Sequence, residues 1–430
     1  MFAGGHERRV SYTGPGVNAA SSERAEPLLP AAATPTLPVP FPRSLARRAA
    51  ATVERARFAI AVYLSSRALL LLVAFVNGAL RHHSFSHELA QWDGLWYREV
   101  ADHGYPNHVV HIQSTLGFFP LYPGLMWLVS HALVIPIAHH QILSSTVAGV
   151  LISGAGGLVA TVLVGRLAVS WWGESVQRRA ILIFCLFPGS VVFSMVYAEG
   201  VMLALVAGCL IALQRRRWVL AGVLAGLATA TAPEAIVIVL VCAVAAAREL
   251  RRGGVRDRSA RRSLLAPALS LTGVGAFGAF LWAWTGSPFA YLIAQHDGWS
   301  EKTNVFAIGD LANTLGHQIS FRHFDHPTID MNLVVGLGGA IVLIVLLALV
   351  WRNRHEMSVE AIVWTLGISW LALTSEYTPP NPRLLMTAFP AVIVLARYVR
   401  GRAFTALLCA SGVMLVGLSA LTFVGTTLRP

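Results

Sequence analysis

The chain has 430 residues and a formal net charge of +12 at pH 7, with 55% hydrophobic and only 13% charged residues. Its mean hydropathy is +0.62. Soluble globular chains carry about a quarter charged residues, so this composition excludes an ordinary soluble enzyme. Apolar runs such as 332–351 and 403–424 are long enough to cross a hydrocarbon core of about 30 Å at about 1.5 Å per residue. The sequence therefore predicts an all-α, multi-pass integral membrane protein.

The first 57 residues differ from the rest of the chain. Residues 1–57 hold seven of the 21 prolines and eight arginines, without an apolar period. This composition favours a disordered basic tail. We find no short apolar run with a cleavage site, so no removable signal peptide is expected. The first predicted span is Phe58 to Leu80, and the arginines before it predict a cytoplasmic N-terminus by the positive-inside rule.

Arginine clusters recur along the chain and are also predicted to face the cytoplasm. These clusters lie at 178–179, 215–217, 248–262, 352–354 and 397–402. With the tail and Arg166 they put 26 of the 33 cationic residues on one side. Residues 180–213 and 219–247 start and end near such clusters, so each is predicted to be a hairpin of two short spans. The hairpins turn outside near 197–199 and 232–234.

This topology gives about eleven spans within residues 58–426. Two long external loops remain, residues 81–141 and 285–330, and function is expected there. Residues 142–165 are the better span, so 117–136, which holds three prolines, is predicted to be a helix in the outer interface. On this topology 13 of the 15 histidines are external.

The first loop carries WDGLWYREVADHGY over residues 92–105 and FFPLYP over 118–123. Trp92, Trp96 and Tyr97 bring aromatic surface at near-helical spacing around Asp93, which is typical of an interfacial helix. An acid wedged among tryptophans beside lipid is desolvated, which suits it to proton abstraction. The alternative interpretation of the aromatic residues is a plain interfacial belt.

These strings resemble the first external loop of the PIG-V family, the GPI mannosyltransferase II relatives that also occur in bacteria. That family lies within the GT-C class of polyprenyl-phosphate-sugar glycosyltransferases. Three further segments match it, FPGSVVFSMVYAEG at 187–200, LATATAPEA at 227–235 and NPRLLMTAFPAVIVLA at 381–396. Relatives often carry an arginine at the position of Ala232, so any role of that arginine is absent here or supplied by another group.

The resemblance implies a GT-C-type helical bundle and an enzyme that moves a hexose, with mannose expected first, from a polyprenyl-phosphate donor with inversion. Such a reaction needs a base for the acceptor hydroxyl, a cradle for the leaving phosphate and a groove for the polyprenyl tail. Position by position, Asp93 is the candidate general base. Arg383 is the first candidate for the phosphate, because a guanidinium can bind two oxygens. Arg98 comes second, and His103 is a further donor.

Aromatic and acidic residues around these positions are the candidates for binding sugar or acceptor: Trp92, Trp96, Tyr97, Asp102, Tyr105, Tyr122, Glu199 and Glu234. Glu199 and Glu234 lie at the outer turns of short hairpins, where an uncompensated charge is costly. Each is therefore expected to be functional or paired, and Glu199 could bind sugar hydroxyls or pair with Arg383. Asp102, His103 and Tyr105 follow Asp93 by about three helical turns and are expected near the site without sharing its contacts.

The 15 histidines include two groups with spacing suited to a metal site. His82/His83/His87 and His323/Asp325/His326 each offer a possible trio. Donors with a single-phosphate leaving group generally need no metal, so neither a metal nor another cofactor is expected. The four cysteines, Cys185, Cys209, Cys242 and Cys409, lie in apolar stretches and are interpreted as buried hydrophobic residues.

The expected partners are a polyprenyl-phosphate sugar, a lipid, glycolipid or glycan acceptor, and membrane lipid, with no nucleic acid. An arginine-rich chain with one lysine, Lys302, indicates a high-GC bacterium and a plasma-membrane location with an extracytoplasmic active site. Two other classes stay open. A transporter or flippase would place ionisable groups near the middle of its spans, where Arg67 is the one predicted charge. A non-catalytic membrane assembly protein would keep this outline without needing Asp93.

Overall fold

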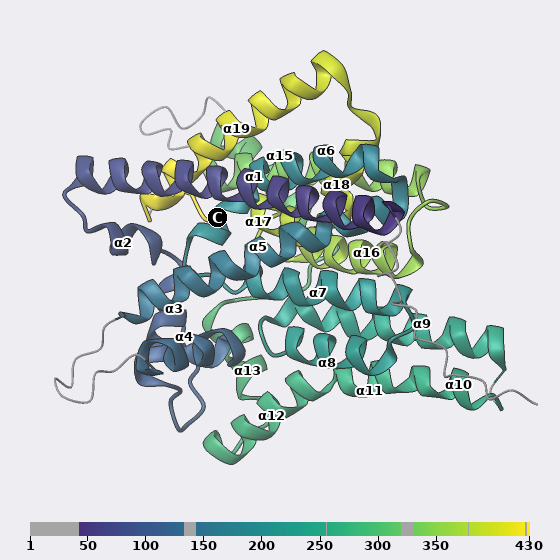
Figure 1. Ribbon diagram of the computed structural model, residues 1–430. Coiled ribbons are helices and arrows are strands. Elements are labelled where there is room, and N and C mark those ends of the chain that lie inside the picture. The colour runs from purple at the N-terminus through teal and green to yellow at the C-terminus, as the bar shows by residue number, and fades with distance from the viewer. Residues whose placement is uncertain (1–42, 133–142, 255, 320–329, 377, 426–427) are drawn as a thin grey trace, which may run out of the picture. The chain divides into compact units, whose positions relative to one another are not determined.

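The computed structural model describes residues 43–132, 143–254, 256–319, 330–376, 378–425 and 428–430. Residues 51–430 form one compact unit, and residues 1–50 are a separate unit. Within the described residues every regular element is a helix (Figure 1). One isolated β-bridge among these residues joins Thr303 to Ser375. The all-α class is therefore confirmed. Most of the predicted tail lies outside the described residues. Its last part, residues 43–57, is helical, because α1 (Arg43–Arg81) begins before Phe58, the predicted start of the first span.

Five helical segments are long and apolar enough to cross a membrane. They are Ala56–Arg81 within α1, α5 (Ser145–Trp172), Arg258–Thr285, α15 (Met331–Arg352) and α19 (Gly401–Phe423). The third of these joins α10 (Arg258–Arg261), η4 (Arg262–Leu264), α11 (Leu265–Ser270) and α12 (Thr272–Thr285). A sixth results if α6 (Glu174–Leu186) and η2 (Pro188–Ser194), which bend by 72°, are one broken span. The protein is a multi-pass integral membrane protein. Four further predicted spans are apolar helices of fewer than 18 residues, too short to pass the same length test in the described residues.

Both predicted hairpins are present. The bent pair of α6 and η2 leads into a turn at 195–198, and the chain returns as α7 (Glu199–Gln214). The second hairpin consists of α8 (Trp218–Ala228) and α9 (Val237–Gly253), joined by η3 (Pro233–Ile236). The turns fall where the arginine clusters predicted them, so Glu199 and Glu234 lie at corresponding ends of the two hairpins.

The two long loops contain short helices. The first loop holds α2 (Phe85–Leu89), α3 (Asp93–His103), η1 (Thr115–Gly117) and α4 (Leu121–Ala132). The helix predicted at 117–136 is thus present as α4, and residues 133–142 lie outside the described residues. The second loop holds α13 (Ala290–Ile293), the π-helical turn η5 (Ala294–Gly298) and α14 (Ala307–Ile319). The remaining helices are α16 (Val359–Thr374), α17 (Pro382–Thr387) and α18 (Phe389–Tyr398).

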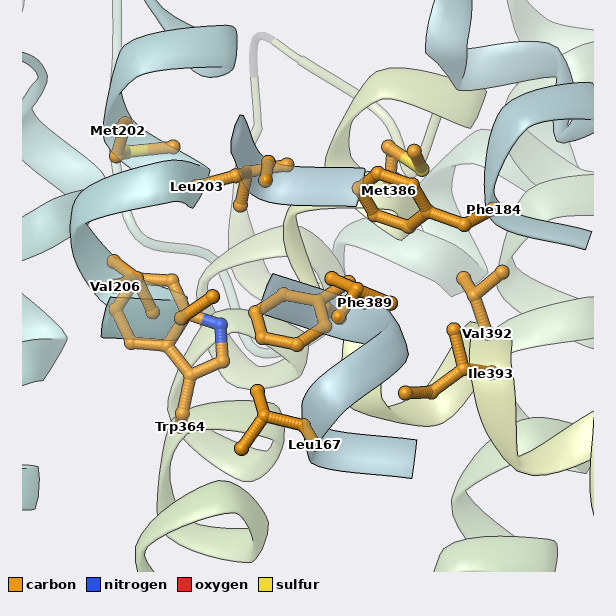
Figure 2. Close-up of a cluster of buried hydrophobic side chains, with 14 of the residues drawn as sticks. Leu167, Phe184, Met202, Leu203, Val206, Trp364, Met386, Phe389, Val392 and Ile393 are labelled. Atoms are coloured by element: carbon orange, nitrogen blue, oxygen red, sulfur yellow. The ribbon is translucent and has the colours of Figure 1, made fainter. Parts of the chain in front are cut away.

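A large buried cluster joins α6, α7, α16 and α18, and Figure 2 shows part of it. Trp364 is fully buried, and its indole N–H donates to the carbonyl of Thr387 at 3.0 Å. The rings of Phe184 and Phe389 lie 6.4 Å apart and meet edge to face. Inside a bilayer such packing stabilises through van der Waals contact rather than through exclusion of water. It fixes α17 and α18 against the bend between α6 and η2.

Two glycines, one in η2 and one at the start of α7, allow neighbouring helices to come into close contact near this bend. A β-carbon on Gly189 of η2 would collide with the carbonyl oxygen of Pro382 in α17. A β-carbon on Gly200 would likewise collide with the carbonyl oxygen of Ser153 in α5. Only glycine permits such contact, since any larger residue would push the backbones apart. Consequently η2 lies directly against α17, and α7 lies directly against α5.

Arg67 of α1 holds the same bend from the other side. Its guanidinium donates to the carbonyl of Cys185 at 3.0 Å, to the hydroxyl of Ser190 at 2.9 Å and to the carbonyl of Ser190. The Cys185 carbonyl lies in the last turn of α6, where helix carbonyls lack partners within the helix. Arg67 therefore replaces the hydrogen bonds that the break in the helix leaves open.

The cysteine prediction holds for three of the four residues. Cys185, Cys209 and Cys242 are buried, whereas Cys409 is exposed on α19. The prediction was wrong at Cys409 because an apolar residue in a peripheral span can face lipid instead of the protein interior.

Candidate functional site

The candidate base, Asp93, lies at the first position of α3. Its Oδ2 accepts a hydrogen bond from Nη1 of Arg383, and its own backbone N–H donates to the hydroxyl of Tyr197 at 3.2 Å. The next residue is Gly94, where an added β-carbon would lie 3.3 Å from Cβ of Val196. The absence of a side chain at Gly94 thus lets the start of α3 rest on the turn before α7.

The backbone just before Asp93 is strained. Trp92 has a φ of 60°, in the left-handed region that residues other than glycine rarely adopt. Such a conformation costs on the order of 1–3 kcal/mol and persists only where the surroundings hold it. The indole N–H of Trp92 donates to the carbonyl of Thr422 in α19 at 3.0 Å, which fixes the strained turn.

Arg383 is delivered by the short helix α17. The side chain of Asn381 caps this helix by accepting from the N–H of Leu384 at 3.0 Å, and its amide donates to the carbonyl of Pro430 at 2.6 Å. The guanidinium of Arg383 lies over the ring of Tyr197, 5.4 Å from the ring centroid. The side chain is 19% exposed.

Glu199 completes the ionic group. It is the first residue of α7 and is only 5% exposed, and its Oε1 lies 3.4 Å from Nη1 of Arg383. One guanidinium therefore faces two carboxylates, those of Asp93 and Glu199. Glu234, half-buried on η3, lies close enough to interact electrostatically with both Glu199 and Arg383. We call Asp93, Glu199 and Arg383 the ionic group.

Two atoms of the ionic group have no hydrogen-bond partner in the described structure. They are Nε of Arg383 and Oε2 of Glu199, and both are buried. Buried polar atoms are nearly always bonded to protein or water, so an exception calls for an explanation such as an absent ligand or water. A donor and an acceptor are therefore available together at this group.

Tyr97 of α3 borders the ionic group on the aromatic side. Its ring meets those of Tyr122 at 4.9 Å and Tyr197 at 6.5 Å. Burial raises the pKa of Tyr97 well above its ordinary value, and the nearby carboxylates of Glu199 and Asp93 raise it further. Its phenol therefore remains neutral and able to donate a hydrogen bond.

The other predicted aromatic residues form a packed layer. Trp96 stacks on Phe118 at 6.0 Å and meets Trp299, from the second long loop, at 5.2 Å. The hydroxyl of Tyr105 donates to the carbonyl of Phe118 at 2.8 Å. Tyr122 is fully buried, and its hydroxyl donates to the carbonyl of Gly149 at 2.9 Å. The hydroxyls of Tyr105 and Tyr122 are thus already bonded to backbone.

Three predicted residues lie farther along α3. The helix has 11 residues, so its ends are about 15 Å apart. His103 pairs with Glu99 at 3.1 Å, and Asp102 accepts a hydrogen bond from Ser145. Arg98 is exposed. In the described part of the chain, none of them has a hydrogen bond or ion pair with the ionic group.

Tyr197 is the residue of this site that the sequence did not single out. It is 1% exposed, and it contacts Asp93 through its hydroxyl and Arg383 through its ring. Its position within FPGSVVFSMVYAEG at 187–200, one of the segments that match the family, was the available signal. Trp299 carried no comparable signal, because nothing in residues 285–330 predicted which part would meet the first loop.

The histidine groups differ in how much can be said. His323/Asp325/His326 lies outside the described residues. Of the first trio, His83 pairs with Glu88 at 3.1 Å and its ring meets that of His87 at 4.7 Å. Among the residues with described positions, no group of three or more histidines, cysteines or acids could hold a metal ion.

Residues 57–251 match the family model described as Mannosyltransferase (PIG-V). Over these residues the chain is similar to the PIG-V mannosyltransferase family. This match confirms the resemblance stated from the first loop, and the predicted enzyme class agrees with the description of the family model. The matched segment contains Asp93, Tyr197, Glu199 and Glu234, whereas Arg383 lies beyond it. No curated protein matches the sequence significantly.

The fold is also similar to solved structures of low sequence identity. ArnT from Cupriavidus metallidurans bound to undecaprenyl phosphate is 17% identical, with a TM-score of 0.49, and the match covers 84% of this chain and 65% of that one. The apo state of the same protein is 15% identical, with a TM-score of 0.46 and coverages of 79% and 60%. The apo oligosaccharyltransferase from Archaeoglobus fulgidus is 13% identical, with a TM-score of 0.44 and coverages of 83% and 56%. The chain spans less than two thirds of the length of each of these proteins.

Proposed function

We propose that this protein, like the PIG-V family that it resembles, transfers a hexose, mannose in the first instance, from a polyprenyl-phosphate-linked donor to an extracytoplasmic acceptor with inversion. The observation that carries the proposal is the ionic group. It brings together an acid that can accept a proton, a guanidinium that can bind phosphate, and two buried polar atoms that have no partner among the described residues. The family match supplies the reaction class.

In the proposed reaction, an acceptor hydroxyl attacks the anomeric carbon of the donor sugar. A new carbon–oxygen bond forms as the bond to the phosphate oxygen breaks, and the phosphate leaves with that electron pair. The hydroxyl proton passes to Asp93. Its Oδ2 is occupied by Arg383, and its carboxylate is 31% exposed, so Oδ1 is the atom available to the acceptor.

Arg383 is assigned to the leaving phosphate. A guanidinium has five N–H donors, and Nε has no partner in the described structure. Binding of phosphate oxygens by this edge would offset negative charge as it develops. Asp93, Glu199 and the ring of Tyr197 hold the guanidinium in place beforehand, so little reorganisation is needed during the reaction.

Glu199 is assigned to a sugar hydroxyl. Its Oε2 lies buried and unpartnered, while Oε1 faces Arg383. A carboxylate oxygen in this position accepts a hydrogen bond from a sugar and thereby orients it. Tyr97 and Glu234 border the same space and are assigned to the sugar or the acceptor as well. Trp92, Trp96, Tyr105 and Tyr122 support the site through packing, and Asp102, His103 and Arg98 are assigned to its rim.

The proposed membrane arrangement is a GT-C-type bundle of about eleven spans. In it the short apolar helices α7, α8, α16 and α18 complete the crossing together with their neighbours. Arginine clusters at the opposite ends of the hairpins from Glu199 and Glu234 support a cytoplasmic N-terminus and an extracytoplasmic site. The location proposed is a bacterial plasma membrane. The hydrogen bonds of Arg67 to backbone carbonyls give that buried charge a structural role and remove its support for a transporter.

A transfer assay tests the proposal. Purified protein or membranes are supplied with radiolabelled polyprenyl-phosphate-mannose, and glycan and lipid mass spectrometry of a deletion strain identifies the acceptor. Asp93→Asn is expected to lower the transfer rate at least about 100-fold, the usual contribution of a general base. Glu99→Gln, an exposed acid on the same helix, is the matched control. Unchanged transfer by Asp93→Asn would remove the base assignment, and absence of transfer by the wild type with any lipid-linked sugar would overturn the enzyme proposal.

A further inference from the structure

Two adjoining cavities lie at the end of α7 opposite Glu199. Because α7 has 16 residues, these ends are about 24 Å apart. The first cavity, about 390 Å³, lies between the end of α7, α9 and the link from α15 to α16. The second, about 410 Å³, runs along α8 and α11. They share Arg216, Trp218 and Glu249, and neither is lined by a residue of the ionic group.

The cavity walls carry an excess of positive charge. Six arginines and two glutamates line them: Arg216, Arg217, Arg248, Arg252, Arg262, Arg354, Glu249 and Glu360. Glu249 pairs with Arg216 at 3.0 Å, and Glu360 pairs with Arg248 at 2.6 Å. The other four arginines have no carboxylate partner among the described residues. Six positive and two negative charges leave a net charge of +4, which favours an anion in this space.

The second cavity also has an apolar wall open to the outside. Val219 is 54% exposed, Leu220 is 44% exposed and Leu265 is 43% exposed. Trp218 lines both cavities, at the junction between the arginines and this apolar surface. Tryptophan at such a junction is typical of the boundary between headgroups and hydrocarbon in a bilayer.

The backbone presents these residues in a fixed way. Arg216 has a φ of 54°, in the left-handed region, within the tight turn that joins α7 to α8. The turn is closed by the N–H of Arg217, which donates to the carbonyl of Ala212 at 2.9 Å. Together with the N–H of Arg216, which donates to the carbonyl of Leu213 at 3.0 Å, this bond forms a Schellman helix ending, and it sets where Arg216 and Arg217 lie.

We propose that the two cavities together bind an anionic phospholipid, with its phosphate headgroup among the arginines of the first and its acyl chain along the apolar wall of the second. The excess of arginines accounts for the anion, and the exposed leucine and valine side chains account for the chain attached to it. A free phosphate compound would use the arginines but would leave the apolar wall uncovered. Basic pockets between membrane helices on the cytoplasmic side bind anionic lipid headgroups for the same reasons. This inference does not depend on the proposed glycosyl transfer.

The test measures lipid affinity of the purified full chain by the shift in its thermal unfolding midpoint. Phosphatidylglycerol is titrated against phosphatidylcholine, with wild type and the double variant Arg252→Gln/Arg354→Gln. Each arginine near the headgroup contributes roughly a five-fold factor in affinity, so the double variant is expected to bind phosphatidylglycerol roughly 25-fold more weakly. The matched control Arg400→Gln/Arg402→Gln removes two exposed arginines at the start of α19 and is expected to retain wild-type affinity.

Three results would overturn the proposal. The first is equal loss of affinity in the cavity variant and the control, which would indicate a general charge effect. The second is equal stabilisation by inorganic phosphate or glycerophosphoglycerol at the same phosphate concentration, which would identify a soluble occupant. The third comes from native mass spectrometry of the wild type with both lipids in competition, which tests the proposal even if the double variant fails to fold. Preferential retention of phosphatidylglycerol supports the site, whereas equal retention of the two lipids overturns it.

Discussion

Arg383 and Asp93 are 290 positions apart in the chain and form an ion pair through Nη1 and Oδ2. Asp93 starts a helix in the first long loop, whereas Arg383 belongs to a short helix in the C-terminal half. Tyr197, from a third segment, lies between them, with its hydroxyl on the backbone of Asp93 and its ring under the guanidinium. The pair therefore depends on three segments that are remote from one another in sequence.

Arg383→Lys is expected to weaken donor binding while retaining the fold. Lysine keeps the positive charge but loses the planar fork that binds two oxygens and stacks on Tyr197. We expect the KM for the polyprenyl-phosphate sugar to rise at least about ten-fold, corresponding to about 1.4 kcal/mol. Steady-state kinetics with varied donor measure this change, and Arg178→Lys, at an exposed site, is the control. An unchanged KM would contradict the assignment of Arg383 to the phosphate.

Glu199→Gln separates a sugar-binding role from a purely structural ion pair. The amide keeps the shape of the side chain and removes one buried negative charge, and Arg383 still has Asp93 as partner. Hydrogen bonds to charged groups contribute about 1.5–3 kcal/mol, so we expect kcat/KM to fall at least about ten-fold with an unfolding midpoint that is unchanged or higher. Full activity of this variant would show that Glu199 contributes only the ion pair with Arg383 and does not bind the sugar.

Gly189→Ala is expected to displace the helix that carries Arg383. The new methyl group would collide with the carbonyl oxygen of Pro382, the residue just before Arg383. Forcing an extra carbon into a packed contact costs about 1–3 kcal/mol, so both the unfolding midpoint and the transfer rate should fall. Gly124→Ala is the matched control, since no atom lies within 4 Å of a β-carbon placed there. Equal behaviour of the two variants would argue against close contact between η2 and α17.

Arg67→Met is expected to destabilise the bend between α6 and η2. Methionine fills much of the space but removes the guanidinium donor from the carbonyl of Ser190 and one of two donors from the carbonyl of Cys185, which keeps the Ser190 hydroxyl; an unsatisfied buried group costs about 1–3 kcal/mol. The unfolding midpoint should fall, and hydrogen exchange over 188–194 should quicken. The control is Arg166→Met, an exposed arginine of α5. A midpoint equal to that of the control would show that Arg67 does not hold the bend.

The successes and failures of the sequence predictions have identifiable physical causes. The spans within α1, α5, α15 and α19 and both hairpin turns were predicted because run length and charge clusters are local features. The number of spans did not follow from the same local features, because α8 with 11 residues and α18 with 10 are too short to cross a membrane alone. Whether such helices complete a crossing depends on their neighbours and not on their own composition.

The sequence by itself therefore determined the membrane class, the positions of the long spans, the family resemblance and the set of loop and turn charges from which a candidate site could be chosen. Only the tertiary structure decided which of these charges meet. The contact of Asp93 and Glu199 with Arg383 depends on the strained backbone at Trp92, the close approach at Gly189 and the ring of Tyr197. The low charge content reduced the number of candidate site residues. Contacts between segments hundreds of residues apart, however, follow from packing in three dimensions, which leaves no periodic signal in the chain.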